Sequence, residues 1–251
     1  MADGLDMDAE FNRFRIDNTL TIREEGKSNG VKIETATLFG HGMVIDFIGD
    51  NDEIIIYDRG KKNFILLDPI HRVQTELSAA DVDHFLTNLR ATIGEKDDKF
   101  YRFILNPEFE ISRSDESGEL LFQSKWFDYR ITTRSFDDPA ISDDYFEFSD
   151  VYCKLNVYLN PGTFTPLARR VVNETLCREK RFPAQVHLKF YPGGKRLFAK
   201  SIEFDSEHRI IRRLSEEDHG RIVRAIHFSK QFQKMTFGNY YKTVTGTDPQ
   251  G

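Results

Sequence analysis

Between residues 13 and 77, short segments that either alternate polar with apolar residues or are apolar throughout follow one another, separated by turn residues. In residues 13–23, for example, Phe14, Ile16, Leu20 and Ile22 alternate with polar side chains. Turn signals recur about every ten residues, and six such segments follow one another. Because successive side chains of a strand point to opposite faces of a sheet, this period predicts a meander of six antiparallel strands.

The rest of the chain mixes helical periods with further strand patterns. Val82, Phe85, Leu86, Leu89 and Ile93 fall on one helical stripe, which predicts a helix after Ser78. We predict further helices at about 148–159, from Thr165 to about Glu179, and after Ser215. Additional strands are expected within 109–133 and 185–214, and the acidic residues 137–150 are interpreted as an irregular stretch.

Aromatic residues support a sheet-dominated fold. The chain contains 22 Phe and 9 Tyr among its 251 residues, and aromatic side chains suit the pleated surface of a sheet. No linker rich in Gly, Ser or Pro divides the sequence, so we expect one domain over residues 1–251 with disordered ends at 1–9 and 244–251. The predicted class is α+β. It has a single curved antiparallel sheet, a half-barrel of about eleven strands, with three or four helices on its concave face.

Two stretches of this pattern resemble a known superfamily. The paired segments 53–58 and 63–69 carry a Tyr-Asp step, and a hairpin joins 120–122 to 129–131. Together they resemble the LolA/LolB-like superfamily of bacterial lipoprotein carriers over about residues 10–135. The resemblance implies a half-barrel that binds acyl chains behind covering helices. The chain departs from that pattern by lacking an export signal and by carrying extra helical sequence between Asp143 and Lys180.

Charge and hydropathy exclude several classes of partner and location. The net charge of −6 argues against nucleic-acid binding, which relies on Lys and Arg side chains that neutralise phosphates. The acidic first ten residues do not form a secretory signal, and no segment approaches the ~20 apolar residues of a membrane span. We therefore expect a cytoplasmic protein that is not an integral membrane protein.

The sequence carries no catalytic, cofactor or metal signature. It has no G-x-S-x-G motif, and Pro192–Arg196 lacks the spacing of a phosphate loop, so that segment is interpreted as a turn. No two histidines are spaced as zinc ligands, and Cys153 and Cys177 lie apart in predicted helices. We expect a protein that is not an enzyme and has neither cofactor nor metal ion.

The sequence contains two clusters of like charge, and it allows two interpretations of their function. One is acidic (Asp137, Asp138, Asp143, Asp144, Glu147 and Asp150), and the other is basic (Arg169, Arg170, Arg178, Lys180 and Arg181). The simpler interpretation is a solvated loop and a solvated helix face that pair with each other. The other interpretation is that the basic cluster binds an anionic headgroup or an acidic partner.

Apolar residues of the predicted inner surface suggest a binding function. If the sheet is a half-barrel, these side chains line its concavity: Phe14, Phe39, Phe47, Phe64, Phe122, Phe148, Val151, Tyr152 and Leu155. An apolar ligand, an acyl chain or a lipid, would then lie between the sheet and the helix near residue 150. The alternative is a filled core, in which case the chain is a protein-interaction or structural module without a small-molecule ligand.

Overall fold

The computed structural model describes residues 13–24, 27, 30–40, 42–49, 53–114, 119–136, 138–160, 165–196 and 200–247. The predicted disordered segment 1–9 lies outside these ranges. Of the predicted disordered segment 244–251, only residues 244–247 are described, and the first two of them belong to the last helix.

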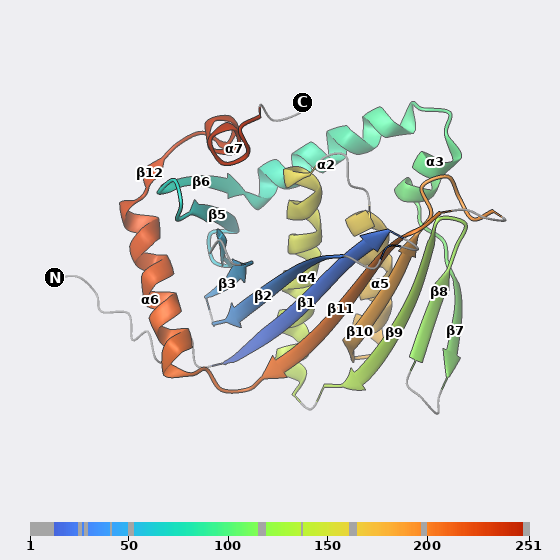
Figure 1. Cartoon of the computed structure of the whole chain (residues 1–251), viewed down its shortest axis with the longest axis horizontal. Coiled ribbons are helices and arrows are strands. Elements are labelled where there is room, and N and C mark those ends of the chain that lie inside the picture. Colours follow the sequence, from blue (N-terminus) through green and yellow to red (C-terminus); the bar gives the residue numbers. More distant parts are fainter. Residues whose placement is uncertain are drawn as a thin grey trace. The chain divides into compact units, whose positions relative to one another are not determined.

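Twelve strands form one open sheet in the described part of the chain (Figure 1), in the order β12-β6-β5-β4-β3-β2-β1-β11-β10-β9-β8-β7. Only β12 pairs parallel, with β6, and every other pair with a described register is antiparallel. The sheet-dominated α+β class is confirmed. The strands are β1 (Phe14–Glu24), β2 (Val31–Phe39), β3 (Met43–Ile48), β4 (Glu53–Asp58), β5 (Asn63–Asp68), β6 (Val73–Ser78), β7 (Glu110–Ser114), β8 (Glu119–Gln123), β9 (Phe127–Ser135), β10 (Arg181–Phe190), β11 (Ile202–Ile211) and β12 (Gln233–Lys234).

Six helices occur among these residues, where three or four were predicted. They are α2 (Ala79–Gly94), α3 (Lys99–Leu105), α4 (Pro139–Leu159), α5 (Thr165–Arg178), α6 (Glu216–Gln231) and α7 (Phe237–Thr245). The short helices α3 and α7 were not predicted. The interpretation of this acidic stretch as irregular was wrong for residues 138–150, because the Asp138 carboxylate caps α4 and Pro139 occupies its first turn. Asp137 lies outside the described residues. None of the described helices is both long and apolar enough to cross a membrane.

The chain divides into two compact units. The first contains Met1–Asn18, Glu34–Asp81 and Arg209–Gly251, and the second contains Thr19–Ile33 and Val82–His208. Strands β1, β2 and β11 and helix α2 each contribute residues to both units. The two units are described separately below.

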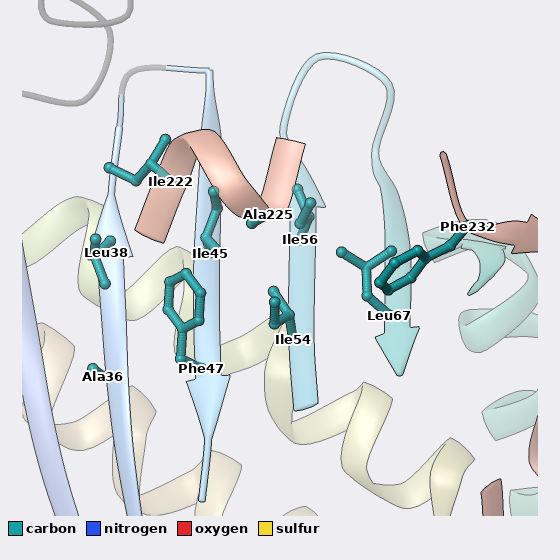
Figure 2. Close-up of a cluster of buried hydrophobic side chains, with 10 residues drawn as sticks. All are labelled: Ala36, Leu38, Ile45, Phe47, Ile54, Ile56, Leu67, Ile222, Ala225 and Phe232. Atoms are coloured by element: carbon teal, nitrogen blue, oxygen red, sulfur yellow. The ribbon is translucent and has the colours of Figure 1, made fainter. Parts of the chain in front are cut away.

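In the first unit, both faces of the sheet are buried. One face packs on α6 through Ile222 and Ala225, as Figure 2 shows, in a cluster with Ala36, Leu38, Ile45, Phe47, Ile54, Ile56, Leu67 and Phe232. The alternate residues form rows across the other face, and one row is Phe39, Val44, Tyr57, Phe64 and Leu77, all at most 5% exposed. Burial of both faces explains why segments such as Ile54–Tyr57 are apolar throughout instead of alternating.

Helix α6 begins at a capping box that the sequence predicted. The Ser215 hydroxyl accepts a hydrogen bond from the Asp218 backbone N–H, and the Asp218 carboxylate accepts one from the Ser215 backbone N–H. Arg15 of β1 also donates to the same carboxylate, at 2.7 Å. Burial would raise the pKa of Asp218, but these hydrogen bonds outweigh it and lower the pKa.

The contact of α6 with the sheet predicts a sharp contrast between two neighbouring residues. Ile222 is 1% exposed and Val223 is 55% exposed. We expect Ile222→Ala to lower the free energy of unfolding by about 2–4 kcal/mol, because it leaves a cavity under α6. Val223→Ala should change it by less than about 0.5 kcal/mol. Urea denaturation followed by circular dichroism measures both values, and equal effects of the two substitutions would contradict this packing.

Candidate ligand-binding site

In the second unit, the sheet separates apolar from charged side chains onto its two faces. Tyr129 of β9 lies opposite Phe122 of β8 and Leu188 of β10, and Leu188 lies opposite Phe204 of β11. The next row on this face joins Leu120, Ile131, Val186 and Ser206. Antiparallel pairing therefore aligns the apolar residues of four strands into one continuous face.

The opposite face of these strands carries ion pairs between neighbouring strands. Glu203 of β11 binds both Lys189 of β10 and Arg23 of β1, and Asp205 binds His187 and Arg23. A ligand with an acyl chain would gain little on this ionic face, so the apolar face is the candidate site.

Helix α5 packs against β10, and α4 and α5 pack against each other (Figure 1). The Tyr145 ring of α4 also lies 5.4 Å from the Phe182 ring of β10. Helix α4 buries Leu155 and Val157, and α5 buries Ala168, Val172 and Leu176, all at 0% exposure. On the outer side of the pair, Arg170 of α5 binds Asp150 of α4 at 2.6 Å. The expected pairing of the acidic and basic clusters is confirmed at this contact.

The nine predicted ligand-binding residues divide between the two units. In the second unit, Phe122 contacts Phe109, while α4 carries Phe148 and Tyr152 in mutual contact at 5.0 Å, together with Val151 and Leu155.

In the first unit, Phe14 stacks on Phe39 at 4.3 Å, and Phe64 lies in the same row as Phe39. Phe47 differs from these three, because it points to the opposite face, under α6, where the Arg221 guanidinium lies 4.1 Å from its ring centre.

One end of the apolar face carries a cluster of aromatic rings, which we call the α3 aromatic cluster. Helix α3 contributes Phe100 and Phe103, whose rings lie 5.9 and 5.0 Å from that of Trp126. The other members continue these contacts toward the buried rings of the sheet: Phe109, Phe122, Phe127, Tyr129 and Phe190. Phe100, Phe103 and Trp126 are partly exposed, whereas Phe122 is 0% and Tyr129 2% exposed. The cluster therefore joins the surface to the interior by apolar contacts.

Arg169 belongs to the basic cluster, for which the sequence leaves open a solvated helix face or an anionic-headgroup site. In the structure its Nε donates to Asn173 Oδ1 at 2.8 Å, and its guanidinium carbon lies 6.0 Å from the centre of the Tyr129 ring. The sequence contains one signal for this position. Arg169 precedes the buried residues Val172 and Leu176 by three and seven positions, so it lies on the apolar stripe of α5.

Burial and the charge of Arg169 shift the pKa values of the ionisable groups near this guanidinium. Burial raises the pKa of Tyr129 and Tyr145, and Arg169 opposes the rise. Burial also raises the pKa of the Cys153 thiol to about 11, so this thiol stays protonated at neutral pH. Cys153 in turn accepts a weak hydrogen bond from Asn173. The group therefore combines one cation with neutral side chains and has no activated thiolate nucleophile.

His208 belongs to the same face as Phe204 and is held neutral. Burial, with Arg169 as a second cause, lowers the pKa of His208 to about 3, against the opposing effect of a hydrogen bond to the Pro183 carbonyl. The ladder between β10 and β9 is irregular between Pro183 and Gln185, as is common where a proline interrupts strand pairing. Nδ1 of His208 is buried and has no hydrogen-bond partner in the described structure.

Within the described ranges, no three His, Cys, Asp or Glu side chains lie close enough together to hold a metal ion.

The lowered pKa of His208 predicts a dependence of stability on pH. In the unfolded chain His208 binds a proton near pH 6.5, whereas in the folded chain it does so only near pH 3. Protonation therefore favours unfolding, and stability should fall by up to about 1.4 kcal/mol per pH unit from pH 6 toward pH 3. Urea denaturation at several pH values measures this slope. We expect His208→Gln to remove this contribution, so that the slope falls by up to about 1.4 kcal/mol per pH unit. An unchanged slope would contradict a neutral His208 in the folded chain.

Comparison with known proteins finds similarity in structure and none in sequence. No family model matches the sequence, and no curated protein matches it. The structure is similar to the crystal structure of a LolA superfamily protein from Nitrosomonas europaea, with 6% sequence identity and a TM-score of 0.27 over 84% of this chain and 91% of that chain.

Proposed function

We propose that this chain is a non-enzymatic binding protein for an apolar ligand with an acyl chain. The ligand would lie in the second unit, against the apolar face of β8, β9 and β10 and beneath α4. The observation that carries the proposal is the α3 aromatic cluster, which extends from partly exposed rings to fully buried ones. Such a path lets a chain enter from solvent and stay in apolar contact along its length.

An acyl chain could bind at this site without specific polar contacts. Each buried CH₂ group of an acyl chain contributes about 0.8 kcal/mol, so a long chain gains enough to offset the cost of association. Aromatic rings suit this role, because they present large apolar areas with few rotatable bonds. Among the predicted residues, Phe122, Phe148, Val151, Tyr152 and Leu155 belong to this unit and are the proposed ligand contacts.

The only tryptophan of the chain, Trp126, provides a direct test because it belongs to the α3 aromatic cluster. A brominated acyl chain with an uncharged methyl ester head should quench Trp126 fluorescence saturably, because bromine quenches only at short range. The unbrominated ester should compete for the same site. Phe103→Ala, which removes a ring from the path, should weaken binding several-fold.

Val223→Ala serves as the matched control for this test, since that residue is exposed on α6 of the first unit and should bind the ester like the wild type. Quenching no greater than that of free tryptophan at the same ester concentration would refute the proposed function.

A second candidate function is binding of a protein partner along an edge of the sheet, and the exposure of β7 favours it. All five residues of β7 are exposed, Ile111 by 40%, and β7 ends the strand order. An exposed edge strand presents unpaired backbone groups that can pair with a strand of another chain.

The edge candidate predicts that one substitution on β7 abolishes partner recovery. Ile111→Lys places a charge on the exposed edge and should remove any protein that co-purifies with the tagged chain. Val31→Lys alters another exposed apolar strand residue, in the non-edge strand β2, and should retain that protein. Quantitative mass spectrometry of the two purifications compares them, and equal recovery with both variants would contradict edge pairing.

A further inference from the structure

We propose that Arg169 and Tyr129 bind the carboxylate of a single-chain fatty acid, whose acyl chain occupies the apolar site of the second unit. This inference rests on the proposed function and specifies the headgroup of the ligand. Both residues belong to the second unit, Arg169 on α5 and Tyr129 on β9.

The first observation is that the charge of Arg169 is not neutralised within the described part of the chain. Its contacts there are the Asn173 side-chain oxygen, the ring of Tyr129 and the side chain of Tyr145, none of which is an anion. The nearby carboxylate of Asp150 is bound by Arg170 and Lys154 instead. Arg169 is half-buried among apolar side chains, where solvent screens its charge only in part, so an anionic guest would be favoured beside it.

The second observation is independent of the first and concerns Tyr129. This residue is 2% exposed, and its hydroxyl has no hydrogen-bond partner in the described structure. A buried hydroxyl without a partner costs about 1–3 kcal/mol, and native proteins rarely leave one so. An oxygen of a ligand headgroup would accept a hydrogen bond from this hydroxyl while its second oxygen binds Arg169.

The charge of the site selects a carboxylate over a phosphate. His208 and Cys153 are both neutral near pH 7, so Arg169 is the cation available to a headgroup among these side chains. One planar guanidinium matches the single charge and the two oxygens of a carboxylate. A phosphate monoester carries a charge of about −1.5 to −2 at pH 7 and would leave part of it buried without a partner.

The rings around Tyr129 give apolar contacts for a chain attached to this headgroup. Tyr129 lies 5.9 Å from Phe109 and 6.4 Å from Phe127, ring centre to ring centre, and both of these belong to the α3 aromatic cluster. A carboxylate at Tyr129 and Arg169 therefore places the first methylene groups of its chain beside that cluster. A ligand with this chemistry is amphipathic, with an apolar tail and one negative charge.

The test compares three ligands that share one brominated eighteen-carbon chain and differ in the headgroup: the fatty acid, its methyl ester and the alkyl phosphate. Quenching of Trp126 measures the dissociation constant of each for the wild type. We expect the acid to bind at least tenfold more tightly than the ester and more tightly than the phosphate. Equal binding of acid and ester, or tighter binding of the phosphate, would overturn the assignment of a carboxylate site.

Three variants locate the headgroup. Arg169→Met keeps the apolar stem but removes the charge, and it should abolish the preference for acid over ester while leaving the affinity for the ester within about twofold. Tyr129→Phe, which removes only the hydroxyl, should weaken binding of the acid several-fold and leave binding of the ester unchanged. Arg170→Met changes the adjacent arginine, which binds Asp150, and should keep the full preference.

The outcomes distinguish this inference from the function on which it rests. If the ester binds but the acid is not preferred, the inference fails and the proposed function stands. If no ligand quenches Trp126, the proposed function itself fails. Should Arg169→Met not fold, Tyr129→Phe and the wild-type comparison of acid with ester still decide, because an unchanged preference in Tyr129→Phe would remove that hydroxyl from the site.

Discussion

The structure of the second unit depends on antiparallel pairing that sorts side chains onto two unlike faces. Along β9, β10 and β11, every second residue joins an ionic face of pairs such as Lys189 with Glu203, and the residues between them join an apolar face. A shift of one residue in this register would exchange the two faces and bury the charges. The ion pairs and the apolar contacts therefore specify the same register from opposite sides, and this register fixes where α4 and α5 pack.

Within the apolar layer, Arg169 is the exception that gives the site its chemistry. Its positive charge lies near Tyr129, Tyr145, Cys153 and His208, which are all neutral at pH 7, and burial shifts the pKa of each further in favour of its neutral form. The result is one cation facing neutral donors and acceptors, without the activated nucleophile that covalent catalysis requires. This arrangement suits recognition of a charged headgroup and gives no support to a reaction mechanism.

The sequence predicted the elements whose residues follow a simple period. Alternation located β1 and β10, the stripe from Val82 to Ile93 located α2, and Ser215 with Asp218 located the start of α6. It failed where the period was short or the composition misleading. Helix α3 has seven residues, too few for a helical period, and its aromatic composition is typical of a strand. The first turns of α4 were taken for a loop because of Asp143, Asp144 and Glu147, although Asp138 followed by Pro139 is a helix-start signal.

The site itself could be predicted only in part, because the sequence cannot show the direction of a charged side chain. The apolar members Phe122 and Leu155 followed from their periods, and both are buried. In the sequence Arg169 and Arg170 belong to one basic cluster with two possible uses, and only the fold separates them, since Arg170 binds Asp150 whereas Arg169 lies near the Tyr129 ring. The lack of a partner for the Tyr129 hydroxyl is likewise a tertiary property.

The most direct measurement is a crystal structure of the protein with the brominated fatty acid bound. The anomalous signal of bromine locates the chain, and the electron density locates the headgroup. The account predicts the bromine among the rings of the α3 aromatic cluster and the carboxylate within hydrogen-bonding distance of Arg169 and the Tyr129 hydroxyl. Bromine elsewhere, or a carboxylate in contact with solvent while Arg169 and Tyr129 keep their present neighbours, would contradict it.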